Sequence, residues 1–224
     1  MNNKIIIGII AAAVVAVGVL VGITLIGGDD DGGTIEGVAA TQERFAGLQQ
    51  SGNTVGNPDA PVEIIEYGDI SCPACRAASE STIPELLDGP VADGTAKLTF
   101  RPIAFINASS ERGALGAEAA AMQDAIWPFV EVLYKNQGPE SEDWLTDAMM
   151  LDVATQLGLD ATQWEEDYQG DDVATAFFES RDAANGHEVT ATPTFVVVGP
   201  GGEETVEGVA NLSDFEDAIA QVQN

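Results

Sequence analysis

Cys72 and Cys75 are the only two cysteines in the chain, and two residues separate them. Thiols at this spacing can close a small disulfide ring, so the pair predicts a redox site before a metal site. A zinc site normally takes four ligands, and His187 is the only other soft or nitrogen ligand in the chain. A purely structural disulfide is the alternative.

The residues around the cysteines predict a strand, a turn and a helix. Residues 62–67 form an apolar, β-branched run, interrupted by Glu66, that is typical of a buried strand. Pro73 suits the first turn of a helix, which we expect over residues 74–87 with a kink at Pro84. Cys72 then lies at a helix N-terminus, where unpaired N–H groups and the helix dipole stabilise a thiolate. We therefore expect Cys72 to be the more acidic thiol.

Three separated motifs carry a resemblance to a known family. They are GNPDAPVEIIEYGDISCPAC at residues 56–75, AIWPFVEVLYKNQ at residues 125–137 and VTATPTFVVVG at residues 189–199. In this order they resemble the DsbA-like branch of the thioredoxin superfamily, from about residue 57 to the C-terminus, with Cys72-Pro73-Ala74-Cys75 as the active-site sequence. The resemblance implies a thiol–disulfide oxidoreductase that uses no cofactor and no metal.

The resemblance also assigns roles to residues outside the cysteine pair. It implies that Glu66 is a buried acid that takes up and returns the proton of Cys75, and that Pro193 follows a cis peptide bond beside the active site. Thr192 and Pro73 are expected to contact substrate. The alternatives are a solvated strand-end glutamate, an ordinary trans proline and a threonine that only packs in the core.

The remaining pattern predicts an α/β fold of the thioredoxin type with a helical insertion. Residues 98–106 read as a second strand, residues 108–186 as helical throughout with Ser109 as an N-cap, and residues 194–198 and 205–208 as a hairpin before a last helix at 212–222. Trp127, Phe129 and Tyr134 have helical spacing and are expected in the core of the insertion. The domain is expected to occupy residues 56–224.

The N-terminal residues predict a membrane anchor at 1–28, followed by an acidic, Gly-rich tether and a short helix at 29–55. Residues 5–26 are uncharged and apolar, and as a helix they would span roughly 33 Å, enough for a hydrocarbon core of about 30 Å. Lys4 on the N-terminal side favours a single-pass protein in the cell membrane with its catalytic domain on the outer face. A cleaved signal peptide is the alternative.

The charge balance limits the partners. The chain has 37 Asp and Glu against 8 Lys and Arg, a formal net charge of −29, which argues against nucleic acid as a partner. This acidity is either a solvated surface of no special meaning or an adaptation to high salt. Arg76 could lower the pKa of the Cys72 thiol, but a solvent-facing position is the simpler interpretation. For His187 the simpler interpretation is a surface or capping role.

An extracytoplasmic site favours an oxidising role, because disulfides persist there. We expect the chain to introduce disulfides into exported proteins and a quinone-linked membrane protein to reoxidise it. Ala74 stands where many oxidases of the family have a histidine, which predicts a milder oxidant and leaves the direction of electron flow open. The alternatives are a reductase or isomerase, for example in cytochrome maturation, and a chaperone-like binder of unfolded chains.

Overall fold

The computed structural model describes residues 34–223. The expected anchor at 1–28 and the start of the expected tether lie outside the described residues. Within 34–223, no helix has both the length and the apolar character that crossing a membrane requires.

A mixed sheet forms the centre of the described domain, with strand order β1-β2-β4-β3-β5-β6. β3 (Val62–Gly68) lies between β4 (Ala96–Pro102), which is parallel to it, and β5 (Thr194–Gly199), which is antiparallel. β6 (Gly202–Glu207) completes the expected hairpin with β5. The predicted strand at 98–106 is shifted to 96–102, and Pro102 ends it, because a proline cannot donate to the ladder.

A short hairpin that the sequence analysis did not predict extends the sheet on the β4 side. It consists of β1 (Gln50–Ser51) and β2 (Thr54–Val55), and β2 pairs antiparallel with β4. Strands of two residues carry no periodic signal, so only their pairing with β4 reveals them. Before them, α1 (Val38–Phe45) packs against the helical insertion.

The expected helix at 74–87 is broken into shorter pieces. These are α2 (Pro73–Glu80), α3 (Thr82–Leu86) and a wider turn, η1 (Leu87–Val91). The break falls at Ser81, because the ring of Pro84 clashes with the carbonyl of the residue four positions earlier and removes one helical hydrogen bond. The kink was predicted at the proline and lies about one turn before it.

The insertion between β4 and β5 contains five helices. They are α4 (Ala108–Ala121), α5 (Ile126–Lys135), α6 (Asp147–Leu157), α7 (Ala161–Tyr168) and α8 (Asp171–Gly186). The prediction of Ser109 as N-cap is wrong: Asn107 caps α4, and its Oδ1 accepts a hydrogen bond from the Ser110 backbone N–H at 3.0 Å. Helix α6 begins at Asp147, because Thr146 caps it.

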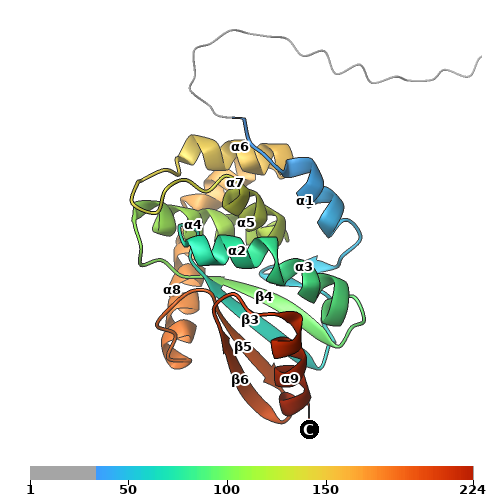
Figure 1. Cartoon of the computed structure of the whole chain (residues 1–224). Coiled ribbons are helices and arrows are strands. Elements are labelled where there is room, and N and C mark those ends of the chain that lie inside the picture. The colour runs from blue at the N-terminus through green and yellow to red at the C-terminus, as the bar shows by residue number, and fades with distance from the viewer. Residues whose placement is uncertain (1–33, 224) are drawn as a thin grey trace, which may run out of the picture. The chain divides into compact units, whose positions relative to one another are not determined.

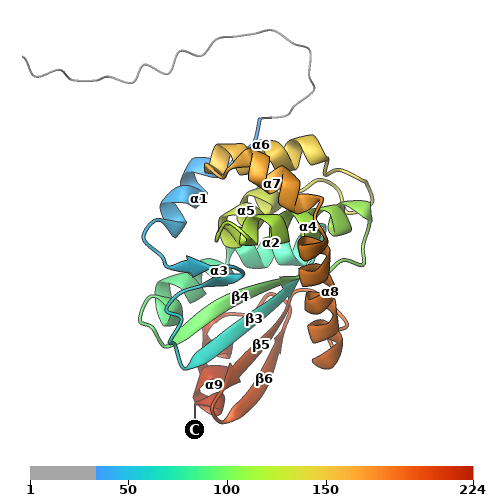
Figure 2. The ribbon, with the colours of Figure 1, turned by 180° about the vertical axis from the view of Figure 1, so that it is seen from behind.

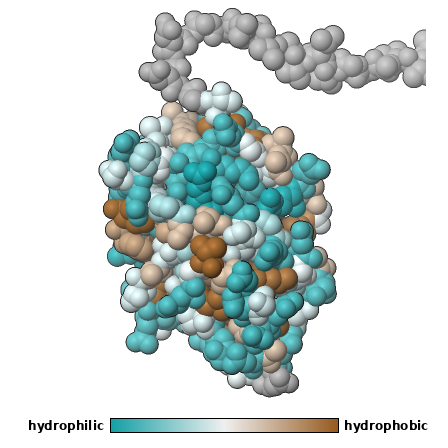
Figure 3. All heavy atoms as spheres, viewed as in Figure 1, coloured by the Kyte–Doolittle hydropathy of each residue, from teal (hydrophilic) through white to brown (hydrophobic). Residues whose placement is uncertain are grey.

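The helices cover the two faces of the sheet unequally. Figures 1 and 2 show α2, α3 and α9 (Leu212–Val222) on one face and α8 on the other, with α4 to α7 gathered beyond one end of the strands. The larger core lies on the α2 side and includes Ile64, whereas Ile65 and Tyr67 belong to a smaller core under α8. Figure 3 shows the outer surface on the α2 side as mostly hydrophilic, with small, separate apolar patches.

Candidate active site

The two cysteines lie at the start of α2, as predicted. Cys72 is the N-cap with an extended backbone (φ −80°, ψ 119°), and Pro73 is the first helical residue, where its fixed φ suits the helix and its missing N–H costs no bond. Both thiols are free, Cys72 is 7% exposed and Cys75 is fully buried. Only the sulfur of Cys72 is therefore accessible to a reaction partner.

The environment of Cys72 stabilises its thiolate. Its pKa falls to about 6, chiefly because the Cys75 thiol donates to it, with further help from Thr192 and from the backbone N–H groups of the first helical turn; burial opposes the shift. As a thiol, Cys72 Sγ donates to the Thr192 carbonyl at 3.3 Å. Arg76 does not contribute, because it pairs with Glu80 on the exposed side of α2 at 3.0 Å.

Cys75 has the opposite character. Burial, the hydrogen bond to Cys72 and the neighbouring charge of Glu66 raise the pKa of Cys75 well above its usual value. The pair thus consists of one reactive thiolate and one buried thiol that needs a proton acceptor before it can react.

Glu66 is buried below the cysteines on the α2 side of the sheet. It pairs with Phe100 on β4 and Phe195 on β5, and its side chain is 1% exposed. Burial first, and then the charge of Cys72, raise the pKa of Glu66 to about 8. Within the described part of the chain, its Oε1 has no hydrogen-bond partner. The carboxyl is therefore protonated at neutral pH and has an oxygen free to exchange a proton.

The loop before β5 reaches the same end of the sheet. The peptide bond between Thr192 and Pro193 is cis, as the resemblance implied, and the contact of Thr192 with Cys72 brings the loop against the reactive sulfur. Pro73 is exposed beside them. His187 is not at this site: its Nδ1 pairs with the Tyr67 hydroxyl at 2.7 Å, under α8.

The helical insertion holds the turn that carries Cys72, a role that the sequence analysis missed. Gln137 Nε2 donates to the carbonyls of Ile70 at 2.7 Å and of Cys72 at 3.1 Å. Trp144 Nε1 donates to the Ser71 hydroxyl at 3.3 Å. These side chains fix the backbone ahead of α2 and thereby fix the direction of the reactive sulfur.

Tyr134 also reaches this turn, although only a core position was predicted for it. Its hydroxyl donates to the Asp69 carbonyl at 3.4 Å, and burial raises its pKa well above the usual value. A Cβ at Gly68 would lie 2.9 Å from this hydroxyl and 2.6 Å from the Phe100 ring, so the approach requires glycine there. The sequence signal for this turn was the pair Gly68-Asp69 at the end of β3.

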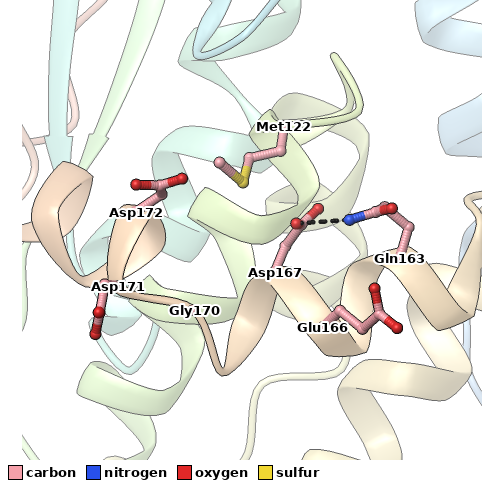
Figure 4. Close-up of a pocket in the computed structure, with 7 residues that line it drawn as sticks. All are labelled: Met122, Gln163, Glu166, Asp167, Gly170, Asp171 and Asp172. Atoms are coloured by element: carbon pink, nitrogen blue, oxygen red, sulfur yellow. Dashed lines mark hydrogen bonds between the residues drawn. The ribbon is translucent and has the colours of Figure 1, made fainter.

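Nothing in the described chain suggests a bound metal. Across residues 34–223, no group of three or more His, Cys, Asp or Glu side chains is placed to hold a metal ion. The pocket of Figure 4, about 420 Å³, lies at α7 and the start of α8, lined by Met122 and several acidic side chains that point in different directions. It contains neither cysteine.

The pKa of Cys72 gives a direct test. We expect the rate of alkylation of the reduced protein by iodoacetamide to rise with a midpoint near about pH 6, because only the thiolate reacts and the buried Cys75 stays protonated. In Cys75→Ala the midpoint should move upwards, because the largest stabilising hydrogen bond is lost. Mass spectrometry of the alkylated peptide across the pH range measures both, and a wild-type midpoint at the unperturbed value of about 8.5 would contradict the arrangement.

The proteins that resemble this chain in sequence are consistent with the two-cysteine site described above. Residues 49–220 match the model of a family described as thioredoxin. The probable disulfide bond formation protein D of Bacillus cereus is 32% identical over 162 residues, which cover 70% of this chain and 74% of the relative.

Solved structures share the fold. Oxidised BdbD from Bacillus subtilis matches with a TM-score of 0.67 and 23% identity over 78% of this chain and 96% of that one. A thioredoxin-like oxidoreductase from Silicibacter pomeroyi matches with a TM-score of 0.63 and 27% identity, covering 75% and 90% of the two chains. The chain therefore belongs to the thioredoxin family, as a DsbA-like thiol–disulfide oxidoreductase.

Proposed function

We propose that this oxidoreductase introduces disulfide bonds into exported proteins through Cys72-Pro73-Ala74-Cys75. The observation that carries the proposal is the contrast between the two thiols: the pKa of Cys72 falls to about 6 while that of Cys75 is raised. A stabilised thiolate favours the reduced enzyme, so the enzyme disulfide becomes a better oxidant. The name of the Bacillus cereus relative, a disulfide bond formation protein, points in the same direction.

In the proposed reaction, a substrate thiolate attacks Cys72 Sγ of the oxidised enzyme. The bond between Cys72 and Cys75 breaks, and Cys75 leaves as a thiolate that takes a proton from the Glu66 carboxyl. A second substrate thiolate then attacks the substrate sulfur of the mixed disulfide, and Cys72 leaves as a stable thiolate. Two electrons pass from the substrate to the enzyme. Reoxidation reverses the enzyme half of the reaction, with Glu66 receiving and returning the proton.

The proposal places the catalytic domain on the outer face of the cell membrane, attached by residues 5–26. The support is the length and apolar character of this run and the position of Lys4 before it. A quinone-linked membrane protein is the proposed reoxidant, since the reduced enzyme needs an electron acceptor that the chain itself does not supply.

A reducing role is the competing candidate, and Ala74 is the residue that favours it, because it cannot donate to the Cys72 thiolate. The equilibrium reduction potential of the full-length protein in glutathione buffers separates the two. We expect a potential near the oxidising values of about −120 to −180 mV, whereas a reductant would lie near about −270 mV. A reducing value would overturn the proposed direction of electron flow.

A further inference from the structure

A second concave feature lies at the active-site end of the sheet, beside the loop that contacts Cys72. It is a pocket of about 190 Å³ between the segment after β4, the C-terminal half of α8 and the start of the loop before β5. Ile103, Phe105 and Val189 give it an apolar lining, and Arg181 contributes a single positive charge. We call it the Arg181 pocket.

Two short connections join the Arg181 pocket to the cysteine site. The backbone N–H of Phe105 donates to Asp69 Oδ2 at 3.0 Å, so one wall is tied to the turn before Cys72. The opposite wall includes Thr190. Two residues further along the chain, the carbonyl of Thr192 contacts Cys72 Sγ. Thr190 and Thr192 are two positions apart and an extended chain advances roughly 3.3 Å per residue, so we infer that a polypeptide bonded to Cys72 can reach the pocket within two or three residues.

The pocket exposes groups that other proteins commonly bury at interfaces. Phe105 is 61% exposed and Phe178, one turn from the pocket on α8, is 56% exposed. The guanidinium carbon of Arg181 lies 5.7 Å from the ring centres of both Phe177 and Phe178. Aromatic residues and arginine are the types that contribute most binding energy at protein interfaces.

The charge of Arg181 is available to a partner. Among the described residues, no carboxylate forms a salt bridge with it, although the chain has 37 Asp and Glu. Arg76 and Arg112, by contrast, pair with Glu80 and Asp143. A guanidinium held against aromatic rings keeps a planar fork of donors that fits a carboxylate.

We propose that the Arg181 pocket selects substrates, and that it binds polypeptide segments in which an aromatic or large aliphatic side chain adjoins an acidic one, two or three positions from the reacting cysteine. The apolar side chain packs between Phe105 and Val189, and the carboxylate pairs with Arg181. The proposal rests on the proposed function, because it requires that a substrate thiol reacts at Cys72.

The test uses full-length oxidised protein, kept in detergent because of its apolar residues 5–26, and reduced single-cysteine peptides. In each turnover two peptide thiols become one peptide disulfide, and the enzyme disulfide becomes a dithiol. One peptide has Phe-Asp beyond the cysteine, a second has Phe-Lys and a third has Gly-Asp, each prepared with the pair on either side of the cysteine. Glutathione, which has no aromatic or large aliphatic side chain, serves as the reference thiol.

With the pair on one of the two sides of the cysteine, we expect the Phe-Asp peptide to react at least about fivefold faster than the Phe-Lys and Gly-Asp peptides. A factor of this size corresponds to one ion pair with Arg181 together with the packing of one apolar side chain. Arg181→Gln should remove the preference for Asp over Lys, and Phe105→Ala the preference for Phe over Gly. Both variants should keep the wild-type rate with glutathione. Arg76→Gln, which removes a paired arginine from the active-site helix, should keep both preferences.

Equal rates for the three peptides in the wild type, or an Asp preference that survives Arg181→Gln, would overturn the proposed selection while the exchange with glutathione continues. A protein that neither glutathione nor any peptide reduces would instead overturn the proposed function. The two failures are therefore separate results of one experiment.

Discussion

Replacing Cys75 with alanine is expected to leave Cys72 trapped in mixed disulfides with its substrates. The adduct forms when the Cys72 thiolate attacks a substrate disulfide and one substrate thiolate leaves. In the wild type Cys75 then attacks Cys72 Sγ, which releases the bound substrate sulfur as a thiolate and closes the disulfide between Cys72 and Cys75. Well-oriented intramolecular groups act with effective concentrations of about 10⁵ M or more, so release should slow by at least roughly 10³-fold. Non-reducing electrophoresis and mass spectrometry of the purified variant would detect the adducts.

Cys72→Ala is the matched control for this prediction. It keeps one thiol in the same turn, but that thiol is the fully buried Cys75, whose pKa is raised, so no adducts should form. If neither variant forms adducts, the cysteines act as an internal staple and the protein does not exchange disulfides. Equal trapping by both variants would contradict the assignment of Cys72 as the reacting thiol.

Replacing Glu66 with glutamine is expected to stabilise the oxidised protein by on the order of 1 to 3 kcal/mol at about pH 7. With both thiols free, burial and then the charge of Cys72 raise the pKa of Glu66 from 4.5 to about 8. In the oxidised protein burial, the larger cause, still holds this pKa above its ordinary value. Between these two values the folded protein holds a proton that the unfolded chain releases, so the wild type loses stability as pH rises through this range. Glutamine does not titrate and removes this loss.

Urea unfolding of the oxidised protein from about pH 4 to 8 measures the effect, because the disulfide removes both thiols from the titration. The gain should be small at the acidic end and grow with pH. Glu63→Gln changes a carboxyl on the other face of β3, where it accepts from the Thr99 hydroxyl at 2.6 Å, and should give no comparable gain. A gain from Glu66→Gln that is constant over the range would contradict a titrating carboxyl. The variant should also exchange more slowly, because Cys75 loses its proton partner.

Local sequence signals sufficed for the parts of the site that lie close together along the chain. The spacing of Cys72 and Cys75 with Pro73 between them, and a strand ending nearby, are enough to predict a thiol at a helix N-terminus. The peptide bond at Pro193 was predicted only because the family resemblance supplied a reason for it. Glu66 was singled out because the family resemblance implies an acid at this position. The strand also contains Glu63, and only the burial of Glu66 in the fold separates the two.

The supports of the site could not be predicted, since they depend on contacts between distant segments. Gln137 and Trp144 reach the turn across 65 to 73 positions of sequence, and their side chains have no pattern that points to it. Asn107 and Ser109 are both good N-cap residues, and only the packing of α4 decides between them. The hairpin of β1 and β2 is too short to show periodicity.

The insertion separates the two halves of the active site by a long stretch of chain. Cys72 and Thr192, which touch in the finished fold, are 120 positions apart. At synthesis rates of about 5 to 20 residues per second, roughly 6 to 24 s pass between the appearance of the first cysteine and of the loop that will cover it. During that interval the nascent chain carries two thiols that the Thr192 loop does not yet cover. It can therefore itself undergo thiol–disulfide exchange before its own active site is complete.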